Sequence, residues 1–132
     1  MAYLRPAFFT RRIFNPLAMR FGISGAVTLA VAGRRSGHEQ AIPVIPVEYG
    51  GVRYLVSPRG EAEWVRNLRA SGGQGALRSA GKSERFHASE IPAAERPLIL
   101  TAYQEVAGRA VAGNFAALPE PQDHPIFRLA PA

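Results

Sequence analysis

The chain has no cysteine in its 132 residues, and aspartate, lysine and tryptophan occur once each. Without cysteine, disulfides, thiolate metal sites and thiol nucleophiles are excluded, and a reducing cytoplasmic location is the expectation. The single aspartate, Asp123, gives little support to a Ser-His-Asp triad, and no G-x-S-x-G motif accompanies the serines. The sequence therefore excludes thiol chemistry and argues against a hydrolase.

Long apolar runs are also missing. No stretch reaches the roughly eighteen apolar residues that a spanning helix needs. The N-terminus lacks the apolar run and the small-residue cleavage site of a secretory signal. At 47% hydrophobic, the chain is long enough to bury one compact core. We predict a single domain over residues 1–132.

Nucleotide, metal and nucleic-acid motifs are absent as well. The sequence contains neither G-x-G-x-x-G nor a P-loop. His38, His87 and His124 fall in different predicted elements without ligand spacing, so no metal site is expected. The N-terminal third is basic and rich in phenylalanine, but without a helix-turn-helix, an aromatic sheet motif or a zinc finger we do not expect nucleic-acid binding.

Positive charge is concentrated at the N-terminus. The formal net charge is +6, and residues 1–38 hold six arginines and no acid, whereas the remaining ten basic and ten acidic residues cancel. Apolar residues recur there every four positions, at Phe9, Ile13, Leu17 and Phe21. This spacing predicts an N-terminal amphipathic helical segment within residues 1–21, interrupted at Pro16. Two roles stay open for it: packing on the domain, or peripheral contact with an anionic membrane, which would make the protein membrane-associated.

After residue 25 the pattern becomes that of strands joined by tight turns. Strands are predicted at 26–32, 40–49, 52–57, 74–80, 84–91 and 126–129, and helices at 61–70 and 92–107, with a loop before the last strand. Hairpin turns are expected at 50–51 and 81–83. Because tight hairpins make antiparallel neighbours, the predicted fold class is mainly β with α: an antiparallel sheet closing toward a barrel, with covering helices.

The most specific local feature is the turn at residues 33–37, Gly-Arg-Arg-Ser-Gly. It brings together two guanidinium groups, a hydroxyl and backbone amides flexed by glycine, and such a set can bind an anion such as phosphate. The same residues also suit an exposed hairpin turn without a ligand. The sequence leaves both interpretations open.

A second candidate region runs from Ser57 to Asn67. The segment Ser-Pro-Arg-Gly at 57–60 joins a predicted strand to a predicted helix, so backbone amides of both point at the same space. On that helix, Trp64 and Asn67 are three residues apart and share one face. The alternatives are that this segment only caps the helix and that Trp64 only fills the core.

Four short motifs occur in a fixed order along the chain. They are Val-Ala-Gly-Arg-Arg-Ser-Gly at 31–37, Ile-Pro-Val at 42–44, Tyr-Leu-Val-Ser at 54–57 and Trp-Val-Arg-Asn-Leu-Arg at 64–69. Together they resemble the deazaflavin-dependent nitroreductase family, over about residues 21–91 and more loosely at 124–129. The resemblance implies an FMN-binding-like split β-barrel that binds the anionic deazaflavin coenzyme F420. It also implies an oxidoreductase that passes hydride to a quinone, a nitro compound or an activated alkene.

The resemblance implies roles for individual residues. The implied cofactor-binding residues are Arg34, Arg35, Ser36, Gly37, Ser57, Arg59, Trp64 and Asn67. The first three match positions that hold the phosphate and the acidic tail in the family, and Arg59 is a neighbour that can supply a further guanidinium. No catalytic residue is assigned, because Tyr103, Ser57 or water could each supply the proton that the reduced acceptor needs.

The sequence departs from the family pattern in three places. Gln40 stands where relatives often have a second basic residue, and Ile45 stands where the nitroreductases often have a tyrosine beside the substrate. The loop between Arg59 and Trp64 is also shorter than usual. Cofactor binding is therefore better supported than any particular small-molecule acceptor. An FMN-dependent reductase of the same fold, a non-catalytic carrier of a cofactor or apolar ligand, and a homodimer all stay open.

Overall fold

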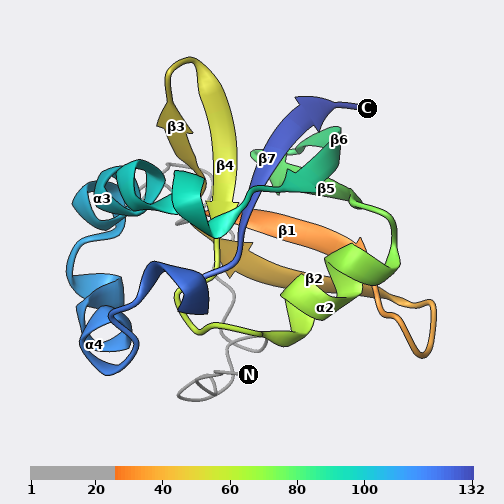
Figure 1. Cartoon of the computed structure of the whole chain (residues 1–132). Coiled ribbons are helices and arrows are strands. Elements are labelled where there is room, and N and C mark those ends of the chain that lie inside the picture. The colour runs from red at the N-terminus through yellow and green to blue at the C-terminus, as the bar shows by residue number, and fades with distance from the viewer. Residues whose placement is uncertain (1–25) are drawn as a thin grey trace.

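The computed structural model describes residues 26–132, which form one curled antiparallel sheet with helices packed against it (Figure 1). The strands are β1 (Val27–Ala32), β2 (Glu39–Val44), β3 (Val47–Tyr49), β4 (Val52–Val56), β5 (Gln74–Ser79), β6 (Lys82–Glu90) and β7 (Ile126–Pro131). The helices are α2 (Glu63–Ala70), α3 (Arg96–Ala107) and α4 (Arg109–Ala117), with short 3-10 turns η2 (Ala93–Glu95) and η3 (Pro121–Asp123).

The strand order is β2-β1-β5-β6-β7-β4-β3, and every neighbouring pair is antiparallel. The edge strands β2 and β3 follow one another in the chain, so the sheet bends back on itself as a half-barrel. Figure 1 shows α3 and α4 together on one side of this sheet, away from α2. The predicted antiparallel sheet with covering helices is confirmed.

Two prolines divide the predicted strand 40–49 into β2 and β3. Pro43 lies in β2 opposite Thr28, and β2 is an edge strand, where a residue without an N–H leaves no ladder position unfilled. Pro46 falls between the two strands, at the point where the chain leaves one edge of the sheet for the other. The strand predicted at 40–49 is therefore two edge strands separated by a break at residues 45–46.

Two apolar clusters form the core. The first lies between the sheet and α2 and contains Leu29, Leu55, Trp64, Leu68 and Phe127, among others. The second lies between the β3–β4 hairpin and the helices α3 and α4, and contains Val47, Ile99, Tyr103, Val111 and Ile126, among others. Ala62 of the first cluster lies in the segment that joins β4 to α2, and Val56 of the second cluster lies directly before it; this segment carries Ser57 and Arg59 of the predicted site.

Ion pairs fix α2 to the sheet. The guanidinium of Arg69 lies 2.6 Å from a carboxylate oxygen of Glu61 and 2.8 Å from one of Glu90 at the end of β6. These bonds raise the pKa of Arg69 above its usual range. Arg69 shares the Trp64–Asn67 helix, but both of its carboxylate partners belong to the scaffold, so its charge holds the helix in place.

Three local predictions need correction or fall outside the description. The turn between β5 and β6 is at Ala80 and Gly81, one residue earlier than expected, and Ala80 adopts a positive φ of 52° that alanine rarely takes. The predicted loop before the last strand contains α4, which the glycines at 108 and 113 concealed. The amphipathic helix expected within residues 1–21 lies outside the described residues. Within residues 26–132, no helix is long and apolar enough to cross a bilayer.

Candidate functional site

A cleft of about 300 Å³ opens where the two core clusters meet. It is bounded by the end of β2, the segment that follows β4, the start of α2, and the helices α3 and α4. The cleft is lined by Ile42, Pro43, Val44, Ile45, Val56, Pro58, Arg59, Ala62, Glu63, Trp64, Tyr103, Ala110, Val111 and Asn114. A larger hollow of about 940 Å³ between Val27 and Lys82 contains none of the predicted site residues.

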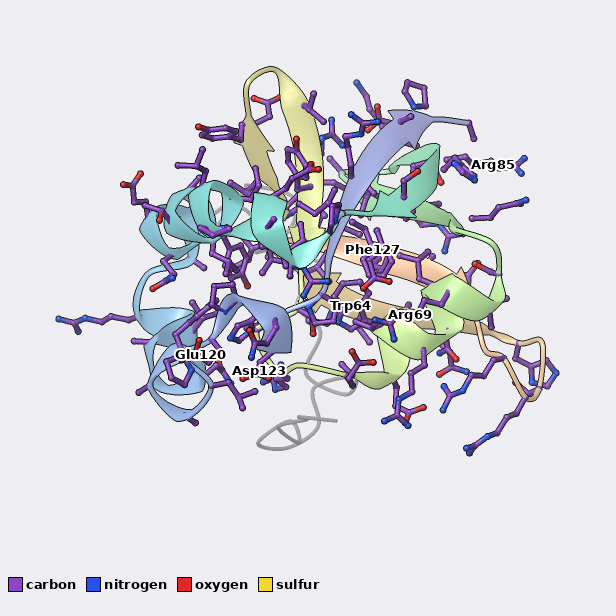
Figure 2. The ribbon with its side chains drawn as sticks, in the orientation of Figure 1. Trp64, Arg69, Arg85, Glu120, Asp123 and Phe127 are labelled. Atoms are coloured by element: carbon purple, nitrogen blue, oxygen red, sulfur yellow. The ribbon has the colours of Figure 1, made fainter. Side chains whose placement is uncertain are left out.

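The walls of the cleft are mostly apolar. Trp64, the single tryptophan, is 9% exposed and packs against Phe127 with ring centroids 5.9 Å apart at an interplanar angle of 56°. Figure 2 shows the two rings side by side at the centre of the molecule. Trp64 is thus a core residue that also lines the cleft, and the sequence had offered these two roles as alternatives. An apolar cleft with an indole in its wall suits a flat aromatic ring.

Three polar side chains in the cleft make no hydrogen bond or ion pair with any other residue of 26–132: Arg59, Tyr103 and Asn114. Arg59 is close enough to Tyr103 for its charge to affect the phenol. A few unpartnered polar groups in an otherwise apolar pocket are what a ligand-binding site requires, because they fix the orientation of the ligand.

The turn at residues 33–37 is docked on α2 beside the cleft. Asn67 Oδ1 accepts hydrogen bonds from the backbone amide of Arg34 at 3.1 Å and from its Nη1 at 2.8 Å. The same Nη1 lies 2.8 Å from Glu63 Oε1, and Glu63 lines the cleft. Arg34 and Asn67 therefore join the turn to the rim of the cleft, and the guanidinium of Arg34 is already occupied by protein partners.

Fewer donor groups of the turn are available to bind an anion than the sequence predicted. The amides of Gly33, Gly37 and His38 donate to His38 O, Gly33 O and Ser36 Oγ respectively. Arg35 and Ser36 are exposed, and within the described residues Arg35 makes no ion pair. An anion at this turn would therefore meet the Arg35 guanidinium and the Ser36 hydroxyl, with Arg34 held behind them.

Electrostatics at the rim centre on Glu63. Its hydrogen bond from Arg34 holds the pKa of the carboxyl below its usual range, and the charges of Arg34, Arg66 and Arg35 act in the same direction. Three guanidinium groups thus surround one carboxylate whose side chain is 64% exposed. The rim keeps an excess of positive charge, which favours anions.

Ser57 lies beneath the cleft rather than in its wall. It is completely buried, and its hydroxyl donates to the carbonyl of Gly60 at 2.6 Å. Its own carbonyl faces Nδ1 of the buried His124 at 2.8 Å, and Nε2 of that ring faces the carbonyl of Leu118 at 2.6 Å. Ser57 and His124 therefore position the segment that carries Arg59.

The sequence did not identify every residue of the cleft. Glu63 was not among the predicted site residues, whereas the structure pairs it with Arg34 beside the cleft. Ala110, Val111 and Asn114 belong to the unpredicted α4. The apolar spacing of 111 and 115, with Asn114 beside them, was the signal that could have revealed this helix. Within residues 26–132 no cluster of histidine, aspartate and glutamate could hold a metal ion.

No protein-family model and no curated protein matches this sequence. Solved structures match the fold. An F420-H2 dependent reductase, FDR-A, has a TM-score of 0.59 at 21% identity, covering 80% of this chain and 94% of its own. The heme storage protein HutZ from Vibrio cholerae has a TM-score of 0.57 at 17% identity over 83% of this chain and 82% of its own.

A third structural match comes from Listeria innocua, in a protein named for pyridoxamine 5'-phosphate oxidase activity. Its TM-score is 0.57 at 10% identity, covering 81% of this chain and 83% of its own. The expected split β-barrel of the FMN-binding-like kind is therefore confirmed as the fold of this chain. Proteins named for different ligands share the fold, so the ligand must be argued from the cleft.

Proposed function

We propose that this protein is an oxidoreductase that binds coenzyme F420 with its deazaflavin ring in the cleft and its anionic tail at the turn of residues 33–37. The observation that carries the proposal is the junction between an apolar cleft containing Trp64 and a rim with surplus arginine charge, built through Arg34 and Glu63. A ligand with a flat ring and an acidic tail matches both parts of the site, because the ring suits the apolar cleft and the tail suits the basic rim.

The residues fit such a cofactor in size and in charge. A cleft of about 300 Å³ lies at the lower end of ligand pockets, so it has room for flat rings but not for a long tail. The tail would lie outside, where Arg35 and Ser36 are exposed and Arg66 adds charge. When bound, the reduced deazaflavin supplies a hydride, and the protein orients the ring and limits access of water.

The similarity of fold to a reductase named for F420-H2 supports this reading. FMN is the alternative cofactor, because it carries a ring and a phosphate and the fold also occurs in a protein named for pyridoxamine 5'-phosphate oxidase activity. The longer acidic tail of F420 favours the deazaflavin here, since Arg35 and Arg66 are both exposed at the rim and together can meet more than one anionic group.

A non-catalytic carrier is the second candidate, and the fold of a heme storage protein favours it. Turnover separates the two. The purified protein is mixed with reduced F420 or reduced FMN and with a quinone, a nitroaromatic compound or an unsaturated ketone, and the return of the oxidised cofactor's absorbance is followed. We expect reoxidation above the protein-free rate with at least one acceptor. Tight cofactor binding without any such acceleration would identify a carrier.

A further inference from the structure

The phenol of Tyr103 lines the cleft. The residue is 3% exposed, and its ring packs against Phe115 with centroids 6.2 Å apart. Among residues 26–132 no group hydrogen-bonds its hydroxyl. Tyr103 is one of the residues that line the cleft, so a ligand that enters this opening can reach its side chain.

An unpartnered hydroxyl on a buried side chain is unfavourable in a stable protein core, where such groups find hydrogen bonds. A phenylalanine at this place would keep the packing against Phe115 and avoid the unbonded oxygen. Among residues 26–132 the hydroxyl is therefore available to hydrogen-bond a ligand atom in the cleft.

The surroundings of Tyr103 specify the chemistry of that atom. Arg59 carries only donors, makes no ion pair with the described residues, and acts electrostatically on the phenol. Burial raises the pKa of Tyr103 far above its usual 10.0, while the charge of Arg59 acts in the opposite direction, so at neutral pH the phenol keeps its proton and donates. Glu63, the one acid of the cleft, is occupied by Arg34. The pair Tyr103 and Arg59 thus offers donors and requires an acceptor oxygen.

Apolar walls exclude a fully charged ligand group but accept a flat conjugated one. A conjugated carbonyl oxygen is a strong acceptor on a planar apolar frame, and it gains negative charge when its system is reduced, which donors beside a cation stabilise. We propose that Tyr103 and Arg59 form the binding site for the carbonyl oxygen of a quinone or an α,β-unsaturated ketone that serves as electron acceptor. The role of the bound molecule as electron acceptor rests on the proposed function, but the binding of its carbonyl oxygen can be tested without cofactor.

The test uses Trp64, the single tryptophan and a residue of the cleft wall, as the reporter. Methyl-1,4-benzoquinone is titrated into the full-length protein, and quenching of tryptophan fluorescence gives its affinity. The chain has no thiol for the quinone to alkylate. Toluene, which has the same ring and methyl group without carbonyl oxygens, is measured by competition. The variants are Tyr103→Phe and, as the matched control, Tyr54→Phe, because Tyr54 packs on the same apolar cluster but does not line the cleft.

We expect Tyr103→Phe to weaken quinone binding about threefold to tenfold, the range of one neutral hydrogen bond, and to leave toluene binding unchanged. Tyr54→Phe should bind both probes like the wild type. Equal quinone affinity in Tyr103→Phe and wild type would overturn the inference. So would an equal loss for toluene, which would show that the ring shape alone had changed. Thermal unfolding of each variant confirms that the fold is retained.

A second titration, with F420 and FMN, separates the two proposals. If Tyr103→Phe weakens cofactor binding and leaves quinone binding unchanged, the hydroxyl belongs to the cofactor and the inference is wrong. If the wild type binds neither cofactor while quinone binding depends on Tyr103, the proposed function fails and the oxygen site stands. If the wild type binds a cofactor, and Tyr103→Phe binds that cofactor equally well but the quinone more weakly, the result supports both the proposed function and the oxygen site.

Discussion

Asn67 on α2 accepts two hydrogen bonds from one residue, the backbone amide and the guanidinium of Arg34, which lies 33 positions earlier in the chain. A single side-chain amide oxygen thereby fixes both the path of the turn and the direction of its first arginine. Asn67 is 6% exposed, so water does not replace it easily. The position of the turn relative to the cleft depends on this contact.

Asn67→Ala should therefore destabilise the protein and loosen the turn. Removing the acceptor leaves a half-buried amide without its partner, so we expect a loss of about 1 to 3 kcal/mol in the free energy of unfolding, measured by urea denaturation. Asn114→Ala is the control, because Asn114 is only half-buried and has no side-chain hydrogen bond within the described residues. Equal stability of Asn67→Ala and wild type would mean that the turn is held elsewhere.

Arg35→Ala tests whether the turn holds an anion. Arg35 is exposed and makes no ion pair within residues 26–132, so the variant should melt like the wild type. A lost charge-assisted hydrogen bond of about 1.5 to 3 kcal/mol should weaken cofactor binding roughly tenfold to a hundredfold. Added salt should reduce wild-type affinity more than that of the variant. Arg85→Ala, an exposed arginine on β6 that Figure 2 shows far from Trp64, should have no effect. If Arg35→Ala binds the cofactor as tightly as the wild type, the turn is an exposed hairpin without a role in binding.

Glu63→Gln tests the competition between the carboxylate and the ligand for Arg34. Removing the negative charge at the rim should raise the affinity for an anionic cofactor about twofold to fivefold, measured by titration at pH 7. The ion pair lowers the pKa of Glu63 from its ordinary 4.5, so its stabilisation is present above pH 4.5 and is lost as pH falls through the lowered pKa.

The same variant therefore has a signature in acid. Wild-type protein should lose stability in this range and Glu63→Gln should lose less, by about 0.2 to 1 kcal/mol for so exposed a pair. Glu84→Gln is the control for affinity, since Glu84 forms an exposed pair with Arg53 and neither residue lines the cleft or belongs to the 33–37 turn. It should leave cofactor affinity unchanged. Weaker cofactor binding by Glu63→Gln would show that the carboxylate helps to hold the ligand.

Trp64→Phe separates packing from binding. The indole fills the core against Phe127 and also lines the cleft, so a smaller ring should lower stability by about 1 to 3 kcal/mol and weaken binding of the ring system. Phe127→Leu removes area from the same contact without altering the cleft lining. If both variants lose stability equally and neither loses affinity at a temperature where both are folded, Trp64 acts only as core.

Much of the fold followed from local patterns in the sequence. The strands, the Gly50-Gly51 hairpin and helix α2 depend on patterns among neighbouring residues, and these were predicted correctly. The turn at Ala80 was misplaced because alanine at positive φ gives no local signal. Helix α4 was missed because two glycines weaken its helical pattern, and only its packing on the second core cluster stabilises it.

The site was harder to predict than the fold, because its contacts join distant parts of the chain. The sequence predicted Arg34 and Asn67 as separate site residues and did not place Glu63 in the site, while the structure joins all three through one guanidinium. Arg34 is 29 residues from Glu63 and 33 residues from Asn67 in the sequence, and contacts over such separations produce no periodic pattern that sequence analysis can detect. That no group within residues 26–132 hydrogen-bonds the hydroxyl of Tyr103 likewise depends on the tertiary fold and not on a local pattern.

The measurement that tests the central claim most directly is a paired fluorescence titration of the purified protein with oxidised F420 and with FMN at the same ionic strength. The account predicts saturable binding of both ring systems, with F420 bound more tightly because its longer acidic tail meets the arginine-rich rim around Glu63. It also predicts that added salt reduces the difference between the affinities for F420 and FMN. Equal or reversed affinities, or no binding of F420, would contradict the assignment of this cleft to a deazaflavin.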